Sequence, residues 1–392
     1  MNEFFLNDEQ IMLQDMVRDF AAKEVLPHVM ELDETGEFPH KIVEMMGELG
    51  LMGIPIPESY SGAGMDQVAY SLAVYELSKV DASVAITMAA HTSLGTMPIL
   101  LAGTEDQKRK YVPPLASGKM IGAFGLTEVE AGSDAGNTKT TAILDKNEWV
   151  INGGKIFTTN AGVAGLLIIT ARTTINNKDE GISAFIIETD NPGLKIGPPE
   201  KKMGWKASDT RQLFFEDLRI PKENLLGNDA DGFKTFLRTL TGGRISIGAL
   251  SVGTAEGAFE AALKYSQERE AFGLPIYRFQ SIGFKLANIA TEIEAAKLLV
   301  YQAAKMYDQG KNVIKQAAMA KLYASEVAMR TTTEAIQIFG GYGYIKEYPV
   351  EKYFRDAKVL TIGEGTSEIQ HLVIMRELVK EYQKSLSFAD TK

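Results

Sequence analysis

Apolar residues recur at helical spacing through the first third of the chain. Met12, Met16 and Phe20 form the clearest stripe, and Asn7 followed by Gln10 is typical of a capped helix start. The pattern therefore predicts an N-terminal helical domain, residues 1–119. Further helix starts are expected at Pro39, Asp66 and Thr104.

The hydrophobic period changes to that of β-strands from about residue 120. Short segments rich in β-branched and aromatic residues are separated there by Gly, Asn, Asp and Pro. Because the strands cluster in one block, we predict a middle antiparallel β domain, residues 120–230, and no alternating βαβ order. The expected strands include 140–144, 166–170, 182–188 and 212–215.

Long helical patterns return after the β block and continue to the end of the chain. They predict a C-terminal helical bundle, residues 231–392. The fold class is therefore α+β and mainly helical, with helical domains on both sides of a sheet. The expected bundle helices are 242–269, 279–308, 313–339 and 366–383.

Composition narrows the classes of function. The chain of 392 residues is 45% hydrophobic, which is enough for two or three domains, and it has no cysteine for disulfides or thiolate chemistry. A net charge of -10 argues against a nucleic-acid groove. The first ten residues carry acids where a signal peptide needs a basic region, and the apolar run 84–101 is too interrupted to cross a membrane. We expect a cytoplasmic protein with neither a nucleic-acid nor a membrane partner.

Common motifs for metal or nucleotide chemistry are missing. The four histidines are scattered, and no His-Glu-x-x-His pair is present, so no metal site is predicted. No Gly-x-Gly is completed to a Rossmann fingerprint, and neither a Walker A sequence nor a Gly-x-Ser-x-Gly elbow occurs. A dinucleotide-binding parallel sheet and a hydrolase are both disfavoured.

The strongest chemical signal is Glu364, which stands between two glycines just before a predicted helix capped by Thr366. The glycines would let a flat ligand approach the backbone, and the carboxylate could then act as a general base. An apolar pocket would raise the pKa of Glu364 and the helix N-terminus would lower it, so the net direction stays open. The alternative is an ordinary turn with a solvated carboxylate.

The segment 364–370, Glu-Gly-Thr-Ser-Glu-Ile-Gln, resembles the C-terminal signature of the acyl-CoA dehydrogenase family of flavoenzymes. The resemblance covers essentially the whole chain, because four more regions follow the family's order. It implies that Glu364 removes the α proton of an acyl-CoA thioester while a hydride leaves the β carbon for flavin N5, which yields a trans-2-enoyl-CoA. The other regions are GLTE at 125–128 with AGSD at 131–134, NGGKIFTTN at 152–160, REAFG at 269–273 and QIFGGYG at 337–343.

The resemblance also implies a binding site for FAD. Thr127 and Thr159 would hydrogen-bond the flavin edge, and Phe157 would offer an aromatic face where many family members carry tryptophan. Arg269 would hold the pyrophosphate of FAD bound to a neighbouring subunit, which requires a homo-oligomer, most often a tetramer built as a dimer of dimers. The implied FAD contacts are Phe124, Leu126, Thr127, Gly132, Ser133, Phe157, Thr158, Thr159, Arg269, Phe272, Phe279, Gln280, Gln337, Gly340, Gly341, Thr366 and Glu368.

A second implied set would bind the acyl-CoA substrate, with short to medium acyl chains expected. In relatives whose base has migrated, a glutamate precedes the position of Arg244, whereas this chain has Gly243 there. Gly363 replaces a tyrosine common in straight-chain members, which would leave room for a methyl branch unless neighbouring side chains refill the space. The set is Ser133, Thr241, Arg244, Gly363, Gly365 and Arg376.

The electron acceptor is the remaining question. Family oxidases that use oxygen usually carry a further C-terminal domain, whereas this sequence ends soon after the signature helix, so an electron-transfer flavoprotein is the expected partner. The alternatives are an oxygen-using acyl-CoA oxidase and a non-catalytic assembly or binding protein on the same fold.

Overall fold

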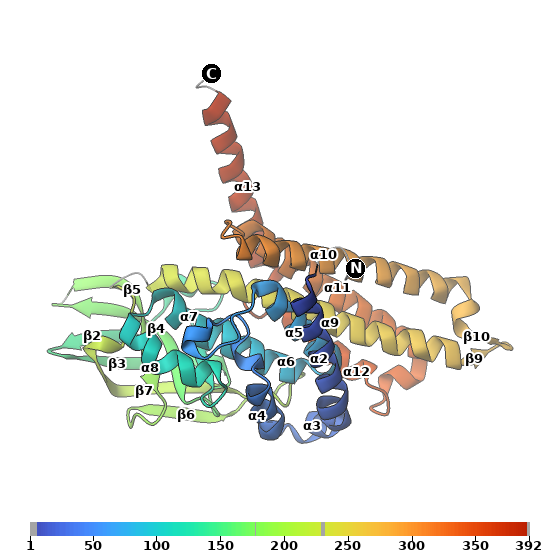
Figure 1. Ribbon diagram of the computed structural model, residues 1–392, viewed down its shortest axis with the longest axis horizontal. Helices are drawn as coiled ribbons and strands as arrows, with labels where there is room; N and C mark the ends of the chain where they lie inside the picture. The colour runs from blue at the N-terminus through green and yellow to red at the C-terminus, as the bar shows by residue number, and fades with distance from the viewer. Residues whose placement is uncertain (1–5, 177, 229–231, 390–392) are drawn as a thin grey trace.

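The computed structural model describes residues 6–176, 178–228 and 232–389. Figure 1 shows an elongated body with a sheet at one end and helices along the rest. The predicted helical, β, helical order is confirmed. The N-terminal helices are α2 (Asp8–Phe20), α3 (Val29–Thr35), α4 (His40–Glu48), α5 (Gln67–Val80), α6 (Ala82–Ala89), α7 (Met97–Ala102) and α8 (Glu105–Ala116).

The caps at the start of α2 and α8 form as the sequence predicts. Of the predicted α2 stripe, Phe20 is buried and Met16 packs half-buried against the core, but Met12 lies outside it. Asn7 and Gln10 make a reciprocal capping box, whereas Met12 is 72% exposed. Gln10 donates to Asp66 at 2.7 Å and Gln14 donates to Glu76 at 2.7 Å. Because these two glutamines bond toward α5, the inner face of α2 is rotated away from Met12.

Residues 82–102 form a nearly continuous helical stretch, with a π-helical segment at 90–96 between α6 and α7. By length and composition this stretch could cross a membrane, but 78% of its apolar window is buried inside the protein. It therefore has the position of a core helix.

The main sheet is mixed, which corrects the prediction of a purely antiparallel domain. The strand order is β6-β7-β3-β2-β4-β5-β8, with β1 beside β4, and β4 runs parallel to both β1 and β2. After β3 the chain passes to the other side of β2 before it forms β4. β4 therefore runs in the same direction as β2. The bounds are β1 (Gly122–Gly125), β2 (Thr141–Asp145), β3 (Glu148–Thr159), β4 (Leu166–Ile175), β5 (Lys178–Glu188), β6 (Leu194–Pro199), β7 (Thr210–Pro221) and β8 (Leu225–Leu226).

The C-terminal part contains the four predicted long helices and one that was missed. The missed helix is the short, charged α12. In Figure 1, α9 runs from the sheet to the small hairpin at the other end of the body, and α13 projects outward. The bounds are α9 (Gly232–Glu268), β9 (Glu270–Ala271), β10 (Leu274–Pro275), α10 (Gln280–Asp308), α11 (Ile314–Phe339), α12 (Val350–Lys358) and α13 (Ser367–Ala389).

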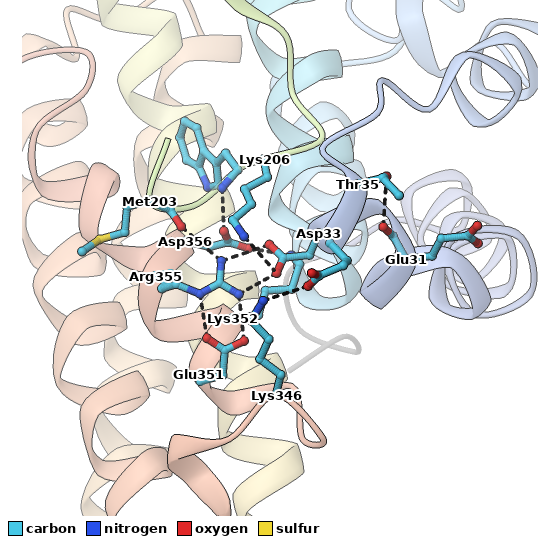
Figure 2. A network of polar contacts seen from close by, with 12 residues as sticks. Glu31, Asp33, Thr35, Met203, Lys206, Lys346, Glu351, Lys352, Arg355 and Asp356 are labelled. Atoms are coloured by element: carbon cyan, nitrogen blue, oxygen red, sulfur yellow. Dashed lines mark hydrogen bonds and ion pairs between the residues drawn. The ribbon is translucent and has the colours of Figure 1, made fainter. Parts of the chain in front are cut away.

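A network of ion pairs connects α12 to the N-terminal helices and to the β domain (Figure 2). Arg355 contacts both oxygens of Asp33 on α3, at 3.0 and 2.6 Å, and both oxygens of Glu351, at 2.6 and 2.8 Å. It also donates to the carbonyl of Met203 in the loop between β6 and β7, at 3.1 Å. One guanidinium therefore joins an N-terminal helix, the β domain and the C-terminal bundle. We call Arg355, Asp33 and Glu351 the Arg355 cluster.

A second group lies beside the first in Figure 2 and makes the same three-way connection. Lys352 pairs with Asp356 at 2.6 Å and with Asp81, the N-cap of α6, at 2.9 Å. Asp356 also accepts the backbone N–H of Trp205 at 2.6 Å. Because α12 leads directly into the loop of Glu364, these contacts set where that loop begins.

Candidate functional site

The loop that carries Glu364 is a tight turn between α12 and α13. Glu364 has a φ of 51° and Gly365 a φ of 93°, so two successive residues adopt the left-handed region that non-glycine residues rarely occupy. Thr366 accepts the backbone N–H of Ile369 at 3.3 Å, which confirms the predicted cap. Gln370 donates to the carbonyls of Glu364 and Gly365, at 3.3 and 2.8 Å. The turn is therefore held from its C-terminal side by α13.

The carboxylate of Glu364 points into the protein. Its Oε2 atom is buried and has no hydrogen-bond partner among the described residues. A Cβ atom placed on Gly243 of α9 would overlap Oε2, so only glycine at that position leaves room for the carboxylate. The alternative of a solvated Glu364 is wrong.

Two buried cations lie near this carboxylate. Arg244 is 5% exposed, and its Nε has no partner among the residues that the structure describes. Lys321 of α11 is 0% exposed and donates from Nζ to the carbonyl of Gly365 at 2.8 Å. Burial raises the pKa of Glu364 to about 7, although the charges of Lys321 and Arg244 oppose the rise. The pKa direction that the sequence left open is thus upward.

Lys321 was not identified from the sequence. The available signal is its place on the buried face of α11, where the other residues are small. That face includes Ala317, Ala318, Ala320 and Ala324. A lysine on an alanine face needs a buried partner, but the sequence does not say that the partner is the carbonyl of Gly365.

The implied flavin contacts of the β domain lie on β1, on β3 and in the turn after β1. Phe157 has a φ of 56° and is 63% exposed, because the β3–β7 register shifts between Lys155 and Thr158. Thr158 is buried, and its Oγ1 has no partner among the described residues. Phe124 stacks on Phe236 of α9 with ring centroids 5.6 Å apart. Leu126, Thr127 and Thr159 are half-buried, while Gly132 and Ser133 are exposed.

A buried ion pair that sequence analysis missed lies behind this segment. Lys155 is 0% exposed and pairs with Glu128 at 2.6 Å, and it also donates to the carbonyl of Leu126 at 3.1 Å. Glu128 in turn accepts hydrogen bonds from the Thr138 hydroxyl and the Lys139 N–H. The pair therefore fixes the backbone between Leu126 and Thr127.

The implied pyrophosphate and adenosine contacts gather at the other end of α9. Arg269, Gly340 and Gly341 line a cavity of about 470 Å³, and the Arg269 guanidinium lies 5.9 Å from the ring centroid of Tyr342. A Cβ on either glycine would meet no atom within 4 Å, so the cradle is open. Phe272 is 95% exposed. Gln280 and Gln337 are exposed, and Phe279 is half-buried.

The implied substrate residues are only partly brought together. Arg244 lies near Glu364, which Gly363 and Gly365 flank in the sequence. Thr241 lies one helical turn before Arg244 on α9. Ser133 and Arg376 are exposed, as is Glu368, an implied FAD contact on α13. A cavity next to Gly242 includes Tyr70, Ser93 and Met97 in its lining. Met97 borders this cavity, whereas Met88 is buried in the core.

Three family models match the chain in order. They are acyl-CoA dehydrogenase, N-terminal domain, at residues 7–119; acyl-CoA dehydrogenase, middle domain, at 123–218; and acyl-CoA dehydrogenase, C-terminal domain, at 230–379. Among curated relatives, the probable acyl-CoA dehydrogenase YngJ of Bacillus subtilis is 53% identical over 96% of this chain and all of its own length. The short-chain specific acyl-CoA dehydrogenase of Clostridium acetobutylicum is 48% identical, with the same coverage.

Solved structures give the same result. A chain in the structure of the electron transferring flavoprotein of Acidaminococcus fermentans matches with a TM-score of 0.94 and 49% identity, covering 96% of this chain and 99% of that one. Butyryl-CoA dehydrogenase of Megasphaera elsdenii matches with a TM-score of 0.93 and 46% identity, with the same coverage. The acyl-CoA dehydrogenase of Bacillus anthracis complexed with FAD has a TM-score of 0.92 and 38% identity, covering 97% of this chain and 68% of that one.

Proposed function

The chain belongs to the acyl-CoA dehydrogenase family, and from this premise we propose that it oxidises short- to medium-chain acyl-CoA thioesters to trans-2-enoyl-CoA, with Glu364 as the base. Membership makes it an enzyme that acts on CH–CH donors with FAD as its cofactor. The observation that carries the proposal is the buried, unpartnered Oε2 of Glu364.

The environment of Glu364 suits proton abstraction near neutral pH. A general base is most effective when its pKa lies near the working pH, and burial raises the pKa of Glu364 to about 7. Because Oε2 has no partner to release, it can accept the α proton of a bound thioester without first breaking a hydrogen bond. Arg244 and Lys321 supply the positive charge that keeps the carboxylate ionised above that pH.

Several features fit FAD. The exposed ring of Phe157 offers a stacking surface, and the orphaned Oγ1 of Thr158 lacks a partner that a polar ring edge would provide. Arg269 and the open Gly340–Gly341 backbone suit a pyrophosphate. When bound, FAD would accept the hydride that leaves the β carbon, so the acyl chain must lie between Glu364 and the flavin.

One chain does not bring the two halves of the FAD set together. The Phe157 group lies near the start of α9 and the Arg269 group at its end, and this helix has 37 residues, which is roughly 55 Å. We therefore propose that a second copy completes each FAD site within a tetramer built as a dimer of dimers. The projecting α13 presents an exposed apolar stripe suited to such a contact, formed by Leu372, Met375, Val379, Tyr382 and Leu386.

We propose an electron-transfer flavoprotein as the electron acceptor. A similar chain occurs in a structure of an electron transferring flavoprotein. Rapid peroxide formation in air, at a rate matching that with such a flavoprotein, would favour an oxidase instead.

Anaerobic mixing of the purified protein with a panel of acyl-CoA thioesters tests the function directly. We expect loss of the visible absorbance of oxidised flavin, fastest with butyryl-CoA and other short chains. A protein that shows no flavin absorbance, even after FAD is added, would contradict the enzyme assignment and favour a binding protein on this fold.

A further inference from the structure

Lys321 is a buried ammonium that pairs with no carboxylate among the described residues. It is 0% exposed on the alanine face of α11, and it donates a hydrogen bond to the carbonyl of Gly365 at 2.8 Å. It forms no ion pair with any residue that the structure describes. Burying a charged lysine without an opposite charge lowers the stability of the fold, which points to a role other than stability.

The carbonyl that Lys321 holds belongs to the turn that aims Glu364. Glu364 is in the left-handed region, with a φ of 51°, and a non-glycine residue stays there only if its surroundings enforce it. Two donors converge on the Gly365 carbonyl, namely Lys321 from α11 and Gln370 from α13, each at 2.8 Å. Lys321 is the only one of the two that also carries a charge.

We propose that Lys321 is a positioning residue for proton abstraction: its bond to the Gly365 carbonyl fixes the turn that points Glu364 at Gly243, and its charge keeps the buried carboxylate ionised. The inference rests on the proposed role of Glu364 as the base. Lys321 does not touch the substrate or the reacting atoms, because it acts through the carbonyl and through the field at the carboxylate.

The charges around Glu364 support the electrostatic half of this role. Lys321 faces it from α11, Arg244 from α9 and the phenol of Tyr70 from α5, while Glu368 of α13 acts on Lys321. Lys321 and Arg244 both lower the pKa of Glu364 against the effect of burial. Removal of one cation should therefore raise the pKa of the carboxylate further.

The test compares three variants in the FAD-loaded enzyme. Lys321→Met removes the charge and the donor at similar length, Lys321→Arg keeps both, and Gln370→Met removes only the uncharged donor. The readout is the pH dependence of anaerobic flavin reduction by butyryl-CoA between pH 6 and 9. Because burial lowers the pKa of Lys321 itself to about 8, the effect of its charge is compared below that pH.

For Lys321→Met we expect the acid limb of the pH–rate profile, where Glu364 loses its proton, to move upward by about one pH unit or more. The rate at pH 7 should then fall by about fivefold or more, with partial recovery at higher pH. Lys321→Arg should keep the limb near its wild-type position. Gln370→Met should slow reduction by a similar factor at every pH, because the turn is loosened without a change of charge.

Two results would overturn the proposal. One is a Lys321→Met enzyme that is slowed equally at all pH values with an unmoved acid limb, which would make Lys321 merely structural. The other is a Lys321→Met enzyme whose rate and acid limb are both the same as those of the wild type. If Lys321→Met does not fold, Lys321→Gln removes the charge but keeps a donor, and the acid limb should still move upward. Failure of the proposed function is distinct, because the wild type itself would then reduce no flavin.

Discussion

The Arg355 cluster and the Glu364 site both bury charge, but they differ in how that charge is matched. Arg355 contacts both oxygens of Asp33 and both oxygens of Glu351. At the other site, Glu364 Oε2 and Arg244 Nε have no partner among the described residues. In the Arg355 cluster the charges pair with one another and join the domains, whereas at the Glu364 site they remain available to a ligand.

The pKa values follow this difference. Burial raises the pKa of Asp33, but the hydrogen bonds and charge of Arg355 outweigh it, and the pKa lies below its usual value. Burial raises the pKa of Glu364 to about 7, and its two cations only partly oppose this. A matched carboxylate therefore stabilises the fold at neutral pH, while an unmatched one destabilises the fold and can accept a proton.

The largest expected effect on stability comes from breaking the matched cluster. Arg355→Met leaves Asp33, which is 3% exposed, without its main partner, and should lower the free energy of unfolding by about 3–5 kcal/mol. Urea unfolding measures this. Because the folded-state pKa of Asp33 is depressed, the loss should be fully present above its unfolded pKa and should shrink as pH falls below about 4.

Arg219→Met is the matched control for this variant. Arg219 also pairs with two acids, Asp145 and Glu148, but all three side chains are about half exposed, at 49%, 49% and 51%. Its removal should lower the free energy of unfolding far less than removal of Arg355, because solvent screens an exposed ion pair. Equal losses for the two variants would show that burial does not distinguish the Arg355 cluster.

The next prediction concerns the space that Gly243 leaves for the carboxylate of Glu364. Gly243→Ala should displace the carboxylate, because the new Cβ would overlap Oε2, and a shift of about 1 Å can lower turnover by about 100-fold. Gly242→Ala is the control, since its Cβ would lie 3.8 Å from the nearest atom, the Tyr307 hydroxyl. If both variants keep bound FAD and lose activity equally, the steric account of Gly243 is wrong.

The unmatched carboxylate should also reduce stability. A pKa of about 7 in place of 4.5 disfavours folding with Glu364 ionised, so Glu364→Gln should stabilise the protein at pH 8 by on the order of 1 to 3 kcal/mol. Wild type should lose this stability as pH rises from about 4.5 through 7, so the two proteins should converge near pH 4.5. Unfolding free energies at both pH values measure the effect, and a Gln variant that is less stable at pH 8 would oppose it.

The smallest effect concerns Gly363, which we propose borders the acyl group. A Cβ on Gly363 would be 3.5 Å from the nearest atom, the carbonyl of Val359, so a side chain can be added there without overlap at Cβ. Gly363→Tyr should disfavour isobutyryl- and isovaleryl-CoA relative to butyryl-CoA, by about 0.8 kcal/mol or more per methyl branch. The ratio of kcat/KM values measures this, and an unchanged ratio would mean that neighbouring groups fill the space.

Local signals in the sequence predicted much of this fold. The caps at Asn7 and Thr104 depend on residues three positions apart, and both form. β3 was not among the strands named from the sequence, and Asn152, Gly153 and Gly154 interrupt its pattern, although the structure accommodates them with a register shift within the strand. Local periodicity could not identify that shift, since it depends on the pairing with β7.

The two charged regions were not equally predictable. Glu364 stands in a recognisable loop, so its candidacy needed only neighbouring residues and a family resemblance. Arg355 and Asp33 are 322 residues apart, and Lys321 is 44 residues from the carbonyl that it holds. Such partners are set by the packing of whole helices, which hydrophobic periodicity does not specify.

The most direct measurement of the central claim is the rate of anaerobic flavin reduction by butyryl-CoA in wild type and Glu364→Gln. The amide is nearly the same size but cannot take the α proton, so we predict retained FAD and acyl-CoA binding with a rate lower by several orders of magnitude, on the order of 10³-fold or more. A variant that reduces its flavin at about a tenth of the wild-type rate would contradict the claim, because the base would then lie elsewhere.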